Sequence, residues 1–248
     1  MSDALLTVGM VPSSLRILSY NIHAGVGLDG RLDLERLAGV INRAQPDLVA
    51  LQEVDRGTRR SQGLDQVAVL SELTGMRGVF CKAMDHDGGE YGQAILSRWP
   101  WQTVETHFLP TVPDEEPRTA TAMRLNLGGE WPEVVFIATH LSWKPVTSIH
   151  VQALRLNELF AVEGNDYRIL AGDMNAVPSA LPIQELKKCW QGENEEEAGA
   201  TFPADEPILK IDHVMVAPRL KLISTEVIDE PVASDHRPVL SVIGLAEN

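Results

Sequence analysis

Short apolar runs that end in polar residues are the feature that most constrains the fold of this chain. Runs of this length, rich in aliphatic and β-branched residues, are typical of β-strands. The polar signatures beside them are Asn21 and His23, Gln52 and Glu53, His140, Asp173 and Asn175, Asp212 and His213, and Asp235 and His236. The sequence therefore predicts a strand-rich fold whose strand ends carry carboxylates, amides and imidazoles.

The spacing of apolar residues places helices between some of these strands. Helical periodicity after Asp33, a good N-cap, predicts a helix that stops before Pro46, and further helices are expected over 64–73, ended by Gly75, and 147–162. The acidic segment 192–207 is predicted to be a solvated loop, and 85–87 a polar loop. Strands are predicted near 15–20, 48–51, 78–83, 93–97, 103–107, 120–127, 134–139, 168–171, 211–216, 220–227 and 239–243.

The order of these elements predicts where the polar signatures meet. The chain opens as strand, helix, strand, and later strands follow one another without helices, which implies antiparallel pairing. In such a sheet the end of one strand lies beside the start of the next. We therefore expect the groups that follow some strands and those that open others to share one rim.

Composition fits one folded domain. Hydrophobic residues make up 44% of the 248 residues and charged residues 23%, values that are ordinary for a soluble globular chain. We expect an N-terminal extension over 1–14 and a single catalytic domain over 15–245. The first 14 residues resemble neither a secretory signal nor a membrane span, so we expect a cytoplasmic monomer without a membrane span. Cys81 and Cys189 are expected to be separate thiols.

The net charge indicates which kinds of partner are favoured. Acidic residues number 35 and basic ones 21, which gives −14. Such a chain repels polyanions at long range, although a local groove with bound metal can reverse the field. Nucleic acid is therefore a possible but not favoured partner.

Glu53 is the best single candidate for a metal ligand, because a carboxylate just past a buried strand can be held toward Mg²⁺. The carbonyl oxygen of Asn21 could complete the site, with His23 on the same side of an extended chain. Taken singly, a surface role for Glu53 and a turn or edge role for the other two are the alternatives.

Two later motifs supply acid–base groups. Asp173 and Asn175 in GDMN can accept a proton from water and donate to a phosphoryl oxygen, or form a simple Asx-turn. In SDHRP, Asp235 offers a metal-facing carboxylate and His236 a base, whose tautomer Asp212 can hold. His140 is either a satisfied core histidine or a donor to the phosphate or leaving group. His86, His107 and His150 belong to no such group.

Taken in order, nine short motifs resemble those of the endonuclease/exonuclease/phosphatase superfamily. They are SYNIH, LQEV, EYGQAILSR, PRTA, THL, GDMN, TFP, IDHV and SDHRPV, and they run from Ser19 to Val239. The resemblance implies an α/β (α+β) fold of the DNase I-like kind, a four-layer sandwich of two packed mixed β-sheets flanked by helices. It also implies a phosphoric ester hydrolase that uses Mg²⁺ or Mn²⁺.

The same resemblance implies roles residue by residue. Glu53 would be the principal metal ligand, with Asn21 and Asp235 near the ion. Asp173 would orient or deprotonate the nucleophilic water, Asn175 and His140 would bind the phosphoryl group, and Asp212 would pair with His236. Tyr91 and Arg118 match positions that contact phosphate. His23 stands where abasic-site enzymes have Asp, and Gln93 where DNase I-like members place a Glu that partners the second histidine.

The resulting hypothesis is hydrolysis of a phosphodiester or phosphomonoester by in-line attack of a water activated by Asp173 or His236. The substrate is expected to be a small-molecule or lipid-derived phosphoester. Trp143, just past His140, would contact a base, a lipid or a sugar, with a packing role as the alternative. The competing hypotheses are a DNA nuclease of the same superfamily and a binding or scaffold protein that kept the fold without the chemistry.

Overall fold

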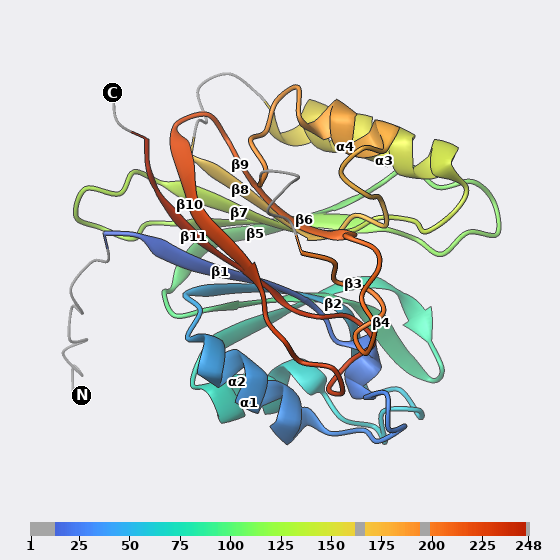
Figure 1. Cartoon of the computed structure of the whole chain (residues 1–248). Helices are drawn as coiled ribbons and strands as arrows, with labels where there is room; N and C mark the ends of the chain where they lie inside the picture. Colours follow the sequence, from blue (N-terminus) through green and yellow to red (C-terminus); the bar gives the residue numbers. More distant parts are fainter. Residues whose placement is uncertain (1–12, 162–166, 194–198, 247–248) are drawn as a thin grey trace, which may run out of the picture.

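Two mixed β-sheets lie face to face in the computed structural model, which describes residues 13–161, 167–193 and 199–246 (Figure 1). The second sheet has the spatial order β5 (Trp101–Phe108), β6 (Thr119–Leu125), β7 (Val134–His140), β8 (Arg168–Asp173) and β9 (Asp212–Val216). The first has the order β10 (Leu220–Val227), β11 (Val239–Leu245), β1 (Leu15–Asn21), β2 (Leu48–Arg56), β4 (Gly89–Ser97) and β3 (Arg77–His86).

Helices cover the outer face of each sheet and complete four layers (Figure 1). The first sheet carries α1 (Leu34–Ala44) and α2 (Gln66–Thr74), and the second carries α3 (Val146–Phe160) and α4 (Leu181–Leu186). A short 3-10 turn, η1 (His23–Gly25), follows β1. The fold predicted from the sequence, a DNase I-like sandwich of two packed mixed sheets flanked by helices, is confirmed.

Local signals explain where the first two helices begin and end. Asp33 and Asp65 are N-caps whose carboxylates accept hydrogen bonds from the backbone N–H groups of Arg36 and Ala68, at 2.8 and 3.0 Å. Helix α2 ends at Gly75, whose φ of 67° lies in the left-handed region that glycine adopts at little cost.

The alternation of side chains along the strands divides the core into three clusters. Ile17, Ala50 and Phe136 point between the two sheets, whereas Leu51 points toward α1 and α2. Leu170 packs under α3 and α4 in the third cluster. Each such fully buried large side chain contributes on the order of 1.5–3 kcal/mol by leaving water. This rigid double layer is the support from which the strand ends project.

Strand pairing brings the polar signatures to one rim. Strands β1 and β2 are parallel, with Asn21 opposite Gln52, and β7 and β8 are parallel, with His140 opposite Asp173. Strand β9 runs antiparallel to β8, so that Asp212, its first residue, faces Asp173. The predicted common rim is therefore present in the structure.

Several predicted boundaries were wrong. Asp85 and His86 belong to β3 rather than to a polar loop, because β3 and β4 extend into a long hairpin. Helix α4 was not predicted, since six residues give too little periodicity. The side chain of Glu193, expected on a solvated loop, is only 8% exposed.

Some predictions fall outside the described residues. These are Val162, residues 194–198 and residues 1–12 of the expected N-terminal extension. The division into extension and domain stays a prediction.

No helix in the described ranges combines the length and apolar character that crossing a bilayer requires.

Candidate active site

A β-bulge sets the position of Glu53. The pairing of β2 with β4 shifts between Leu51 and Val54, and Glu53 has a φ of 56°, which is unusual for a residue with a side chain. The bulge turns the Glu53 carboxylate to the rim, where its Oε1 accepts a hydrogen bond of 3.0 Å from Asn21 Nδ2. Backbone strain of this kind is common at functional sites.

The carboxylate of Asp173 lies close to side chains from both sheets. Its Oδ2 accepts a 3.2 Å hydrogen bond from Asn21 Nδ2 and lies 3.5 Å from His140 Nε2 and 3.7 Å from His236 Nε2. Its Oδ1 accepts a 2.8 Å bond from the backbone N–H of Asn175. Burial and the nearby charge of Asp212 raise the pKa of Asp173 to about 7, against the opposing effect of His236.

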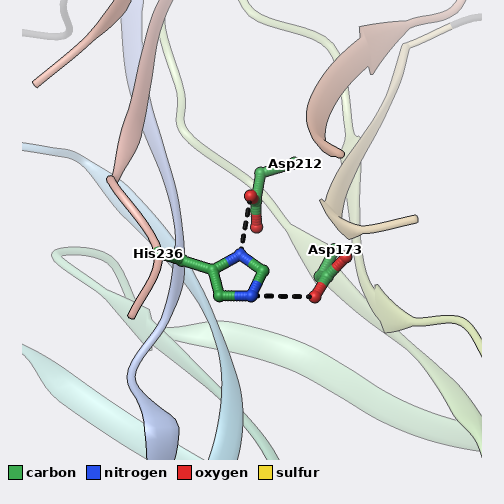
Figure 2. Close-up of side chains that lie close together, drawn as sticks. All are labelled: Asp173, Asp212 and His236. Carbon is green, nitrogen blue, oxygen red and sulfur yellow. Dashed lines mark hydrogen bonds and ion pairs between the residues drawn. The ribbon is translucent and has the colours of Figure 1, made fainter. Parts of the chain in front are cut away.

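His236 and Asp212 form a buried hydrogen-bonded pair (Figure 2). His236 Nδ1 lies 2.9 Å from Asp212 Oδ2, and the ring of Phe202 packs at 4.9 Å from the imidazole. Burial alone would lower the pKa of His236, but the carboxylates of Asp212, Asp173 and Asp235 outweigh it and raise that pKa to about 10. Asp212 therefore fixes the proton on Nδ1 and leaves Nε2 directed at Asp173.

His140 meets the opposite surroundings. Its Nδ1 accepts a 3.0 Å hydrogen bond from Arg118 Nη1, and Asn175 Nδ2 lies 3.3 Å from its Nε2. Burial first, and then the charges of Arg118 and His236, lower the pKa of His140 well below its usual value. The ring is therefore neutral near pH 7, with its proton on Nε2.

Asn175 is also held in a fixed position at the rim. Its φ of 47° places it in the left-handed region that Asn tolerates better than most residues, and its side-chain Nδ2 donates to the carbonyl of Leu141 at 3.0 Å. The predicted GDMN pair thus lies at the rim with both polar side chains tied to neighbouring segments.

Arg118 and Tyr91 are both deeply buried, at 6% exposure each. Arg118 Nη1 also donates to Glu116 Oε1 at 2.7 Å, so that the guanidinium is shared between Glu116 and His140. Both residues line a cavity of about 220 Å³ that also includes Glu53. Their predicted contact with phosphate stays a prediction.

Trp143 is exposed over 63% of its surface, which removes the alternative that it is a core packing residue. It lines the cavity with Glu53 and a second one of about 320 Å³ whose wall includes Asp114, Glu115 and Glu116. The Lys144 ammonium lies 3.7 Å from the centre of the indole ring.

Asp235 and His23 lie at the edge of this arrangement. Asp235 Oδ1 is 4.0 Å from His23 Nδ1 and accepts a 3.3 Å bond from Ser234 Oγ, which also donates to the backbone carbonyl of Asn21 at 2.7 Å. The segment that carries Asp235 is thereby tied to the end of β1, next to the Asn21 side chain.

The donor set fits a hard divalent cation. Glu53, Asn21 and Asp235 present carboxylate and amide oxygens, which Mg²⁺ and Mn²⁺ prefer. Ligand atoms of Asp173, Asp212 and His236 also lie within 4.8 Å of one another. Both groups are also held by bonds of their own, since His236 Nδ1 lies 2.9 Å from Asp212 Oδ2 and Asn21 Nδ2 donates to Glu53 Oε1 at 3.0 Å.

Sequence reasoning missed three polar residues that line the cavity beside Glu53. Arg60, whose guanidinium pairs with the buried Asp55 at 2.7 Å, and Glu116 both lie in its wall. His86, to which no chemistry was assigned, also lines it and packs at 5.9 Å from the ring of Tyr91. Neither a motif nor a periodicity marks them, because the turn after β2, the long β3–β4 hairpin and the loop before β6 bring Arg60, His86 and Glu116 to the site.

The fold and the rim together define an α/β sandwich with a carboxylate–imidazole site at the strand ends. The family model "Endonuclease/Exonuclease/phosphatase family" matches residues 18–236. The chain belongs to this family, whose members include phosphatases, nucleases and phosphodiesterases, are generally hydrolases and typically depend on a divalent metal.

Solved structures share the fold. An endonuclease/exonuclease/phosphatase from Beutenbergia cavernae DSM 12333 is 23% identical, with a TM-score of 0.77 over 95% of this chain and 72% of that one. A mannosyl-6-phosphatase from Bacteroides thetaiotaomicron VPI-5482 is 18% identical, with a TM-score of 0.75 over 94% and 100%. The human Nocturnin catalytic domain with bound sulfate is 17% identical, with a TM-score of 0.73 over 94% and 95%. A search of curated proteins found no significant match.

Proposed function

We propose that this protein is a metal-dependent phosphoesterase that hydrolyses a small or lipid-derived phosphoester. One observation carries the proposal: the Asp173 carboxylate is contacted from both sheets by Asn21, His140 and His236, within 3.7 Å of each. Attack of water on a phosphate ester needs a group that accepts a proton and a cation that stabilises charge. A carboxylate that lies between two imidazoles and beside oxygen donors for a cation provides this arrangement.

Glu53, Asn21 and Asp235 would hold Mg²⁺ or Mn²⁺. When bound, the cation would polarise the phosphoryl oxygens and neutralise the charge that develops on them. The bulge at Glu53 and the 3.1 Å hydrogen bond from the His23 backbone N–H to Asn21 Oδ1 support this assignment, because they hold two of the three donor groups in place before any ion arrives.

The remaining residues divide the work of proton transfer and charge stabilisation. Asp173, whose pKa is about 7, can accept a proton from the attacking water near neutral pH. His236 carries its charge next to Asp173 and stabilises the anion. The neutral His140 and the amide of Asn175 would donate to the phosphoryl group.

The cavity beside Glu53 and the second cavity beside Trp143 favour a small substrate. Their volumes of about 220 and 320 Å³ are at the low end of small-molecule sites. Asp114, Glu115 and Glu116 in the wall would repel a phosphate backbone, which disfavours nucleic acid. The likeness to a mannosyl-6-phosphatase also favours a small phosphate ester.

We also expect the protein to be a cytoplasmic monomer.

The test is hydrolysis of bis(p-nitrophenyl) phosphate and p-nitrophenyl phosphate with Mg²⁺ or Mn²⁺, alongside plasmid DNA and sugar phosphates. We expect Glu53→Gln to abolish turnover and EDTA to do the same to the wild type. Glu133→Gln, an exposed residue near the start of β7 and far from the rim, is the matched control and should keep full activity.

Activity that survives both Glu53→Gln and EDTA would refute the metal-dependent mechanism. Preferential cleavage of plasmid DNA would instead establish the nuclease alternative. A folded wild type that turns over none of these substrates would favour the scaffold alternative.

A further inference from the structure

A second group of buried ionisable residues lies directly behind the site. Glu193, Lys210 and His213 expose only 8%, 5% and 5% of their side chains. The Lys210 ammonium lies 2.8 Å from Glu193 Oε1, and His213 Nδ1 lies 3.6 Å from the same oxygen. Burying three ionisable groups is costly unless they are paired, and the proposed chemistry uses none of them.

His213 connects this group to the active-site loop. Its Nε2 lies 2.9 Å from the backbone carbonyl of Ala176, which can only accept, so Nε2 must carry the proton and donate. Nδ1 on the other side of the ring faces the Glu193 carboxylate. The imidazole therefore lies between Glu193 and Ala176, with Nδ1 facing the Glu193 carboxylate and Nε2 facing the Ala176 carbonyl.

The neighbouring backbone makes the same connection. The N–H of Met174, between Asp173 and Asn175, donates to the carbonyl of Ile211 at 2.8 Å. The 173–176 segment is thus fastened at two points to the strand that presents Asp212. Burial would raise the pKa of the Glu193 carboxyl, but His213 and Lys210 outweigh it and lower that pKa, which is consistent with a charged, paired carboxylate.

We propose that Glu193, Lys210 and His213 form a positioning cluster that holds the 173–176 segment in register with Asp212. Within the cluster, His213 makes the contact with the 173–176 segment, at the carbonyl of Ala176. Glu193, whose charge is neutralised by Lys210, sets the orientation of the His213 ring. The role assigned to the cluster in turnover rests on the proposed function. The cluster touches neither the reacting atoms nor the proposed metal ligands, and acts through Ala176 and the backbone.

The kinetic test compares His213→Phe, which removes the donor to Ala176, with His213→Gln, whose amide can still donate. We expect His213→Phe to lower kcat for bis(p-nitrophenyl) phosphate about 10- to 100-fold, since small displacements of reacting groups have effects of this size. KM should stay within about twofold, because the substrate cavities are unchanged. His213→Gln should recover most of the loss.

A matched control is available in His150, whose Nε2 lies 3.8 Å from Glu185 Oε2 on the outer helices. His150→Phe removes a comparable histidine–glutamate contact without touching the 173–176 segment, and should leave kcat unchanged. A residue that only added stability would change the melting temperature and leave the kcat of the folded protein intact.

Hydrogen exchange measured by mass spectrometry separates this inference from the proposed function. In His213→Phe the amides of 173–177 should exchange faster, while peptides from β1 and β2 stay as in the wild type. This readout is informative even if the wild type hydrolyses no phosphoester, a result that would remove only the proposed function. If His213→Phe does not fold, Glu193→Gln takes its place in both measurements.

Folded His213→Phe with kcat within twofold of the wild type and unchanged exchange over 173–177 would overturn the proposal. Equal loss of kcat in His213→Phe and His213→Gln would also overturn it, since the hydrogen bond to Ala176 would then be irrelevant.

Discussion

The two ends of the site hold the same side chain at similar depth, yet one imidazole is neutral and the other is positively charged. His140 is 7% exposed and lies against the guanidinium of Arg118, whereas His236 is 5% exposed and lies against the carboxylate of Asp212. Burial lowers the pKa of both rings, but only His236 has carboxylates that outweigh it. Because burial acts on both rings in the same direction, the comparison teaches that the difference between their proton states comes from the charged groups beside them.

This difference assigns separate tasks to the two histidines. The cationic His236 can stabilise the ionised Asp173 or pass on a proton, while the neutral His140 can donate a hydrogen bond from Nε2 but supplies no charge. Gln93 contributes to the difference. It stands where DNase I-like members carry a Glu, but its amide donates to the backbone carbonyl of Thr119 at 2.8 Å, so no carboxylate at this position reaches His140.

Removing the carboxylate from the His236 end should have the largest effect. In Asp212→Asn the ring loses the charge that holds its proton, and we expect kcat for bis(p-nitrophenyl) phosphate to fall about 10²- to 10⁴-fold. NMR titration in EDTA should show the pKa of His236 falling from its wild-type value of about 10. Asp85→Asn, at an exposed position, is the control. An unchanged pKa in Asp212→Asn would contradict the comparison.

The two ends should also give stability slopes of opposite sign with pH. The folded pKa of His140 lies below 6.5, so its contribution is complete above pH 6.5 and is lost as pH falls below that value. The folded pKa of His236 is about 10, so its contribution is complete below pH 6.5 and is lost as pH rises from 6.5 through 10. Each of these contributions approaches about 1.4 kcal/mol per pH unit, and Asp173, whose folded pKa is raised to about 7, opposes the His140 contribution as pH falls below 7.

Urea unfolding in EDTA across this pH range measures both slopes. His140→Gln should flatten the acid limb relative to the wild type, and His236→Gln the alkaline limb. If both variants altered the same limb, the assignment of opposite proton states would be wrong.

Placing a carboxylate near His140 should make the two ends more alike. Gln93→Glu replaces the amide donor to Thr119 with an acceptor beside His140 and Arg118, which line the same small cavity. We expect the pKa of His140 to rise and the free energy of unfolding to fall by about 1–3 kcal/mol. Gln184→Glu, which removes a similar amide bond to the exposed Pro178 carbonyl, should cost less. A His140 pKa that does not rise would contradict the idea that Gln93 keeps this end free of negative charge.

Much of the rim was predictable because short-range patterns specify it. Asn21, Asp173 and Asp212 follow or open strands whose apolar alternation is clear, and strand pairing then brings them together. The pairing of His236 with Asp212 was also expected and is present at 2.9 Å. The partner of His140 was not predictable, because Arg118 reaches it from a loop whose path depends on how β6 packs beside β7.

Residues whose roles depend on burial were the least predictable. Glu193 reads as one of several acidic residues on a solvated segment, yet in the structure it is enclosed with Lys210 and His213. His86 reads as part of a polar turn, yet it lines the cavity beside Glu53 because the β3–β4 hairpin is longer than its apolar run suggests.

The sequence by itself determined the alternation of strands and helices, the family and the set of polar groups at the strand ends, since these follow from local periodicity and short motifs. Only the tertiary structure decided which charge faces each histidine, which acidic residue is buried and which loops line the cavities. Those properties arise from contacts between distant segments, and electrostatic interactions at such contacts depend on distances and burial that local patterns do not specify.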